Sequence, residues 1–234
     1  GLCPVRGHSN VQGDRTVGIN HNPSDEFLSS LNTEFGIDIP DDAGLDAVES
    51  VRKMNKGEAG VFISMGGNFL SAMSDTKATA EGLQKCSLTV QISTKPNRSH
   101  LVTGMTGIIL PCLGRTELDN TGGKTQFVTV ENSMGVVHKS IGKRRPASNH
   151  LLSECAIVAG IAIAIEEKME SSGIPWKNLV SDYDNIRDCI ERTIPGFEEY
   201  NRRSRVDGGF YLPNPPRDKR VFHTKNGLAN IITH

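Results

Sequence analysis

Residues 59–68 read Ala-Gly-Val-Phe-Ile-Ser-Met-Gly-Gly-Asn. The first seven form a short apolar run of the kind that makes a buried strand, and the paired glycines Gly66 and Gly67 are typical of a tight turn. A helical stretch over residues 69–85 follows directly. The order strand, glycine turn, helix is the start of a unit in which parallel strands alternate with helices.

Two further strands are predicted along the chain, at residues 87–93 and 107–111, and a polar loop at residues 94–100 separates them. A helix over residues 42–55 precedes the unit. Its apolar residues lie three apart from Leu45 to Met54, and Asp41 or Asp42 is expected to cap it. This alternation predicts an α/β fold with a parallel sheet flanked by helices.

The remaining elements are less regular. A strand is predicted over residues 125–130, a long helix over 150–171 with Ser148 or Asn149 as its cap, and a second helix over 183–192. Residues 220–224 alternate like an edge strand, and residues 1–41 are predicted as loop with one short helix near 26–35. We therefore expect irregular N-terminal and C-terminal segments around the parallel sheet.

Composition excludes several classes of protein. The 234 residues carry 26 Lys and Arg against 27 Asp and Glu, so no overall field attracts nucleic acid or an anionic membrane. The basic runs at 143–145 and 202–205 are accordingly predicted as solvated surface. The longest apolar run, residues 156–165, is about half as long as a bilayer span requires. We predict that residues 156–165 lie in a buried helix. For the protein we predict no nucleic-acid partner and no membrane segment.

Five cysteines are present, an odd number that argues against a disulfide framework and fits a reducing cytoplasm. No CxxC pair occurs, so this chain is expected to supply neither a zinc site nor an iron–sulfur site of the usual spacing. The first residues carry no signal-peptide pattern and no initiator Met. We therefore expect the chain to be a piece of a longer protein.

Two neighbouring strand ends carry residues suited to an anionic ligand. Gly66, Gly67 and Asn68 follow the first strand, and the loop after the second strand offers polar groups that include Lys95 and Arg98. Ligands of open α/β sheets bind at the carboxyl ends of the strands. The alternative is that the glycines serve only the geometry of the turn and that the loop is merely solvated, since no GxGxxG motif is present.

A third segment lacks any predicted secondary structure. Residues 6–13 read Arg-Gly-His-Ser-Asn-Val-Gln-Gly, a run of hydrogen-bonding side chains held between glycines. Such a loop is either mobile or built around a ligand.

This segment resembles the R-G-Q-N-N-V-Q-G stretch of molybdopterin oxidoreductases, specifically the formate dehydrogenase alpha-subunit family. Residues 61–70 are similar to the family's strand followed by G-x-N-P or G-E-D-P. Residues 88–91 and 108–111 resemble its V-V-Q and D-V-I-L-P block, and residues 117–133 fall where the family has a glycine turn and a strand. The resemblance covers at least residues 1–164, with four motifs in the family's order.

The resemblance implies an enzyme that carries molybdenum or tungsten on two molybdopterin guanine dinucleotides, usually with a [4Fe–4S] cluster. Such an enzyme oxidises a small anionic substrate such as formate to CO2 and passes two electrons to an electron-transfer partner. This chain resembles the middle of the subunit, because the family's cluster cysteines and metal ligand lie upstream and a second pterin domain lies downstream. The family's metal ligand lies far upstream of the Arg-Gly motif, whereas Cys3 lies just before that motif. We therefore assign no metal ligand within the chain.

The resemblance also assigns roles by position. Arg6 matches the arginine that holds the substrate carboxylate, a task suited to a bidentate guanidinium. His8 falls where the family has a Gln near the pterin, and together these two are the predicted catalytic residues. The predicted cofactor-binding residues are Gly7, Asn10, Gln12, Gly66, Gly67, Asn68, Thr94, Lys95, Asn97, Arg98 and Glu154.

One departure from the family pattern concerns guanine recognition. The family often places an acidic residue just after V-V-Q, whereas this chain has Ile92-Ser93-Thr94-Lys95. Recognition there would depend on the polar side chains of the loop at residues 94–98.

Three segments follow from the resemblance. They are a loop segment at 1–41, a Rossmann-like cofactor-binding domain at 42–172, and a helix with a connecting tail at 173–234. We expect the isolated chain to have no turnover. The alternative is a Rossmann-like nucleotide-binding regulatory module without redox activity, and a plain interaction domain that uses the basic runs is a third hypothesis.

Overall fold

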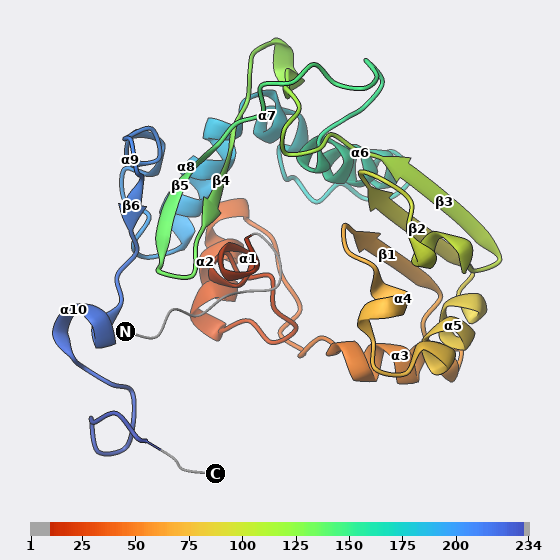
Figure 1. Ribbon diagram of the computed structural model, residues 1–234, viewed down its shortest axis with the longest axis horizontal. Coiled ribbons are helices and arrows are strands. Elements are labelled where there is room, and N and C mark those ends of the chain that lie inside the picture. The colour runs from red at the N-terminus through yellow and green to blue at the C-terminus, as the bar shows by residue number, and fades with distance from the viewer. Residues whose placement is uncertain (1–9, 232–234) are drawn as a thin grey trace.

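The computed structural model describes residues 10–231 (Figure 1). Its helices are α1 (Val11–Thr16), α2 (Asp25–Phe35), α3 (Ala47–Asn55), α4 (Phe69–Ala72), α5 (Thr76–Lys85), α6 (Glu154–Glu166), α7 (Trp176–Ser181), α8 (Tyr183–Thr193), α9 (Tyr200–Arg203) and α10 (Pro215–Lys219). The strands are β1 (Val61–Met65), β2 (Leu88–Ser93), β3 (Thr106–Pro111), β4 (Val128–Glu131), β5 (Val136–Ser140) and β6 (Phe210–Tyr211). Short 3-10 turns occur at η1 (Arg98–Leu101) and η2 (Thr121–Gly123).

The first three strands form a parallel sheet in the order β1-β2-β3. Ile63 pairs with Val90, and Val90 pairs with Ile108, so these three side chains lie on the same face. Helices α3 and α5 cover one face and α6 lies on the other, as Figure 1 shows. The structure confirms the predicted α/β class and the parallel sheet flanked by helices, with irregular stretches at residues 36–46 and 220–231.

Aliphatic side chains hold this unit together. On the α3–α5 side the buried residues are Val51, Met54, Leu83 and Cys86. On the α6 side they are Val90, Ile92, Cys112 and Ile157. Burial of such side chains stabilises a fold by about 1.5–3 kcal/mol each, so these two layers account for most of the packing of the parallel sheet.

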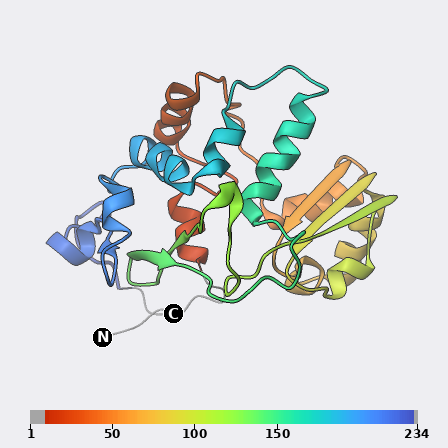
Figure 2. The same cartoon turned by 90° about the horizontal axis from the view of Figure 1, so that it is seen from above.

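The other three strands form a separate antiparallel sheet in the order β4-β5-β6. Its buried residues are Val137, Phe197, Tyr200 and Leu212, with Phe210 packed against them. The predicted strand at 125–130 is therefore present as β4, but it pairs outside the parallel sheet. Figure 2 shows the two sheets at opposite sides of the molecule.

Local caps explain where the helix predictions were too long. The stretch 69–85 is two helices, because the Asp75 carboxylate accepts the Ala78 N–H at 2.9 Å and starts α5 afresh. Ser153 caps α6 in the same way, so that helix begins at Glu154 instead of near residue 150. Asp46, and neither Asp41 nor Asp42, caps α3.

Three predictions were wrong. Residues 220–224 form no strand, and the edge strand lies earlier, at Phe210–Tyr211. Residues 11–16, predicted as loop, form α1. Within the run 202–205, Arg203 stacks on Phe210 at 3.9 Å and Arg205 pairs with Asp184 at 2.7 Å, so these two arginines serve the fold. Residues 143–145 are exposed as predicted.

The described part of the chain contains no helix with both the length and the apolar character that crossing a membrane requires.

Candidate functional site

The turn after β1 exposes its backbone. Gly66 and Gly67 have φ angles of +66° and +67°, which L side chains rarely adopt. The Gly66 N–H donates to the Ile92 carbonyl at 2.8 Å, which fixes the turn to the end of β2. A Cβ built on either glycine would meet nothing within 4 Å, so a ligand has room to approach this backbone.

The loop after β2 is tied to that turn by side chains. Asn97 Nδ2 donates to the Gly67 carbonyl at 2.7 Å, and Ser99 Oγ donates to Asn68 Oδ1 at 2.9 Å. The Leu70 N–H in turn donates to Ser99 Oγ at 2.9 Å. The structure thus brings the glycine turn and the loop at 94–98 together, while the ligand that they bind stays a prediction.

Asn97 has a structural task of its own. Its Oδ1 accepts the Ser99 N–H at 2.9 Å, and its backbone N–H donates to His100 Nδ1 at 2.9 Å, which closes a capping box on η1. Both polar atoms of its side chain are therefore used within the protein. Asn97 shapes the loop, and ligand contacts would come from its neighbours.

Those neighbours are accessible. Thr94, Lys95 and Arg98 are exposed, and neither Lys95 nor Arg98 forms an ion pair with an acidic side chain among residues 10–231. Two unpaired cations beside an open glycine turn are suited to phosphate oxygens.

Glu154 reaches the same edge of the sheet. An isolated bridge between Cys112 and Leu152 joins the end of β3 to the residues just before α6. Burial raises the pKa of Glu154, and the negative charge of Asp14 in α1 raises it further, although part of the side chain remains in solvent. Glu154 and α1 therefore face each other beyond the carboxyl ends of the strands.

The second half of the Arg-Gly motif lies in α1 and at its cap. Asn10 has φ +65°, its Oδ1 accepts the Glu131 N–H at 2.9 Å, and its Nδ2 donates to Asp14 at 3.1 Å. Thr16 Oγ1 donates its one hydrogen to the Glu131 carboxylate at 2.5 Å, and it lies 3.1 Å from the Gln12 carbonyl. Asn10, predicted to touch a cofactor, thus holds α1 against β4. Arg6, Gly7 and His8 lie outside the described residues.

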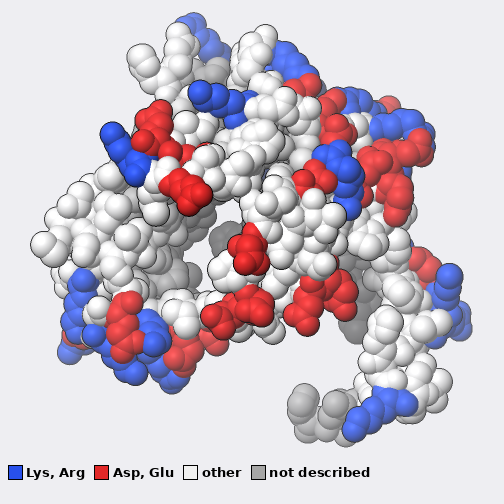
Figure 3. Space-filling model, turned by 180° about the vertical axis from the view of Figure 1, so that it is seen from behind, with Lys and Arg blue, Asp and Glu red and all other residues white. Residues whose placement is uncertain are grey.

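A hollow separates the parallel sheet from the two N-terminal helices. Figure 3 shows it as an opening near the centre of the molecule, with acidic side chains along one rim. A cavity of about 640 Å³ lies on the α1 side, and Asp14, His21 and Asp46 are among the residues that line it.

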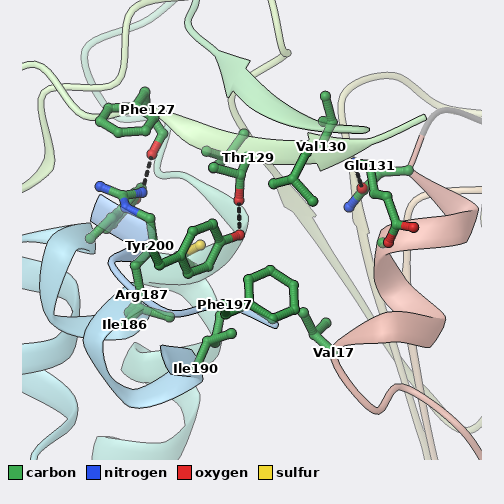
Figure 4. Close-up of a pocket in the computed structure, with 16 residues that line it drawn as sticks. Val17, Phe127, Thr129, Val130, Glu131, Ile186, Arg187, Ile190, Phe197 and Tyr200 are labelled. Atoms are coloured by element: carbon green, nitrogen blue, oxygen red, sulfur yellow. Dashed lines mark hydrogen bonds between the residues drawn. The ribbon is translucent and has the colours of Figure 1, made fainter. Parts of the chain in front are cut away.

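A second, mostly apolar cavity of about 160 Å³ lies between α1, β4 and α8 (Figure 4). The hydroxyls of Tyr200 and Thr129 form a hydrogen bond of 2.6 Å at the wall of this cavity. Arg187 Nη1 donates to the Phe127 carbonyl at 3.0 Å. The sequence analysis missed this cavity. Its lining comes from four separated segments without a common motif, so no sequence signal pointed to it.

The described cysteines are unsuited to nucleophilic chemistry. Burial raises the pKa of Cys112, Cys155 and Cys189 to about 11, with nearby acidic groups adding to the effect. Their thiols therefore stay protonated at neutral pH. Within residues 10–231, no group of three or more His, Cys, Asp or Glu side chains is arranged to hold a metal ion.

The geometry defines an α/β protein with an accessible, cation-bearing site at the carboxyl ends of two parallel strands. No family model matches its sequence. An uncharacterized oxidoreductase of Mycobacterium tuberculosis is 50% identical over 234 residues, which is 100% of this chain and 30% of that protein. The protein YdeP of Escherichia coli K12 is 48% identical over 233 residues, with the same two coverages. The chain spans about 30% of the length of the curated relatives it matches.

Proposed function

We propose that this chain is part of a larger oxidoreductase and that it binds a molybdopterin guanine dinucleotide, as in formate dehydrogenases. The relatives named oxidoreductases support the first half, because they align with the full length of the chain at 50% identity. The observation that carries the second half is the open turn at Gly66 and Gly67, fixed by Asn97 to a loop with two unpaired cations.

The residues present fit a phosphate-containing cofactor. The backbone of Gly66 and Gly67 faces open space, so phosphate oxygens have room beside it. Lys95 and Arg98 would neutralise the phosphate charge, and the Thr94 hydroxyl adds a donor for guanine or ribose. When bound, the metal of the cofactor would take up two electrons from the substrate.

The substrate would be a small carboxylate such as formate. In this proposal Arg6 binds its two oxygens with the planar guanidinium, and His8 lies beside the pterin. We expect the 234-residue chain alone to bind part of the cofactor and to show no turnover, because the resemblance puts the metal ligand and cluster outside it.

Metal and pterin analysis of the complete gene product is the direct test of the cofactor. We expect molybdenum or tungsten, an oxidised pterin fluorophore and released GMP. A correctly folded product, prepared from cells that load other molybdopterin enzymes, that contains none of the three would contradict the proposal.

Calorimetric titration of the 234-residue chain with GDP, and with ATP for comparison, tests whether the glycine turn binds a guanine nucleotide. We expect guanine-selective binding that is lost in Gly67→Val, because the side chain would block the turn's open backbone. Gly57→Val is the matched control, since Gly57 also has a positive φ of +73° and open space but lies at the end of α3. Selective ATP binding would favour the nucleotide-binding regulatory module instead.

The Arg6→Ala variant of the complete product tests the substrate site. Formate oxidation should disappear while the pterin content stays unchanged, and the exposed Arg52→Ala control should keep full activity. Wild-type activity in Arg6→Ala would remove the assigned role.

A further inference from the structure

One face of β1 is left uncovered. Val61, Ile63 and Met65 are 59%, 53% and 43% exposed, although they alternate along a strand whose other face packs against α3 and α5. These three residues pair in register with Leu88, Val90 and Ile92. Their side chains therefore share the α6 face of the sheet.

Helix α6 covers only part of that face. Ile157 and Ile161 pack over β2, while Val158 and Ile165, seven residues apart on another side of the helix, are 42% and 51% exposed. A helix that is apolar on all sides is normally buried on all sides. Both α6 and the neighbouring face of β1 therefore lack a packing partner among residues 10–231.

This pattern differs from ordinary surface. Single apolar residues are scattered over every soluble protein, but three successive positions on one face of a strand are not scattered. Parallel sheets are covered by helices on both faces. The covered face of β1 obeys this rule, and the other face does not.

The topology indicates what belongs there. The sheet runs β1-β2-β3 in one direction, and within residues 10–231 no strand lies on the outer side of β1. The connection from β1 to β2 carries α5 on one face of the sheet. A right-handed connection that leads from this sheet to a strand added beyond β1 would run the opposite way, so its helix would lie on the α6 face. The curated relatives have more than twice as much chain outside the matched segment as inside it, since the match is 30% of their length.

We propose that the longer polypeptide supplies a strand next to β1 and an amphipathic helix that packs over Val61, Ile63 and Met65 beside α6. This inference is independent of the cofactor, because it rests on packing and topology alone. It makes β1 an inner strand, and it places the glycine turn after β1 inside the assembled sheet instead of at its edge.

Thiol labelling of the complete gene product tests the proposal. In Ile63→Cys, we expect a maleimide to react with the introduced thiol roughly tenfold or more slowly than in Lys77→Cys, because a covered thiol reacts only through local opening. Lys77 is the control because its side chain is 88% exposed. It lies on α5, which packs on the opposite face of the sheet from Ile63. Val61→Cys, read out by peptide mass spectrometry, repeats the measurement should Ile63→Cys fold poorly.

Equal labelling rates at positions 63 and 77 would overturn the proposal. Protection that disappears on dilution would also overturn it, because the occupant would then be a second copy of the chain. Protection that is independent of concentration supports it, whether or not the protein contains pterin.

Discussion

The two sheets of this molecule use their charged residues in opposite ways. In the antiparallel sheet unit, cations are part of the packing: Arg187 is 4% exposed and lies 3.9 Å from the Phe127 ring, and Arg203 lies at the same distance from Phe210. In the parallel sheet unit the core within residues 10–231 is made of apolar side chains without a buried cation, and Lys95 and Arg98 stand in solvent at the strand ends.

This difference helps to distinguish cations that stabilise the fold from cations that are free to bind a ligand. A charge that is already paired and stacked has little left to offer a ligand, whereas an unpaired cation beside an exposed backbone does. A basic run such as 202–205 is therefore a weaker indication of binding than two isolated cations in a strand-end loop.

The largest expected effects come from the two cores. Phe197→Ala should lower the free energy of unfolding by about 3–5 kcal/mol, and Leu83→Ala by about 2–5 kcal/mol, because both side chains are almost fully buried. Denaturant unfolding followed by circular dichroism and by Trp176 fluorescence measures both. If the sheets unfold independently, each variant should shift one of two transitions.

A single transition that shifts equally in both variants would contradict that independence. It would show that the two sheets unfold as one cooperative unit.

Arg187→Ala should cost about 3 kcal/mol, more than the loss of any exposed cation, because it removes a buried guanidinium from its ion pair with the half-buried Asp184. It also removes the donor to the Phe127 carbonyl. Arg202→Ala is the matched control, since its pair with Glu199 is exposed and should be dispensable. An equal decrease in the free energy of unfolding in the two variants would show that the stacking and burial of Arg187 do not contribute to stability.

The pH dependence of the two units should have opposite signs. Burial opposes ionisation of Asp184, but hydrogen bonds and charges from Arg205 and Arg187 lower its pKa overall. Its contribution is therefore complete above its ordinary value of 3.8 and is lost as the pH falls below it. The raised pKa of Glu154 acts the other way, and stability declines as the pH rises from 4.5 through the folded value.

Unfolding measured from pH 3 to pH 8 in Asp184→Asn and Glu154→Gln checks this. Asp184→Asn should weaken the decrease in the free energy of unfolding at acidic pH. Glu154→Gln should raise the free energy of unfolding near neutral pH. The assignment fails if Glu154→Gln is less stable than wild type at pH 7, since an uncharged amide there should relieve the repulsion from Asp14.

The smallest effect on stability is expected at the strand-end loop. Lys95→Ala and Arg98→Ala, separately or together, should leave the melting temperature unchanged, because both side chains are exposed and unpaired. Affinity for GDP should nevertheless fall. A marked loss of stability would show that these cations serve the fold, as Arg187 does.

The sequence was most informative where local signals were strong. The run at 59–65 followed by two glycines predicted β1 and its turn, because strand-like runs and turn chemistry are local properties. A short helix was also predicted near 26–35, where the structure has α2. The neighbouring strand ends also predicted that Gly67 and the loop at Asn97 would meet.

Features that depend on distant residues were not predictable in this way. The pairing of β5 with β6 joins Val137 to Phe210, more than 70 positions further along the chain, and the contact of Asn10 with Glu131 spans 121 positions. The strand wrongly predicted at 220–224 alternates as a strand would, but the described part of the chain offers no strand that pairs with it. The roles of Arg6 and His8, and the domain boundaries, remain predictions.

The hydrogen bonds from Asn97 and Ser99 to the turn after β1 have one further consequence, which concerns conformational entropy. A loop that must be ordered by its ligand loses backbone freedom on binding, at roughly 1–2 kcal/mol per residue. Here the turn and the loop are already ordered against each other through side chains of the protein itself. A ligand at this edge therefore meets a preorganised surface, and binding should proceed with little loss of chain entropy.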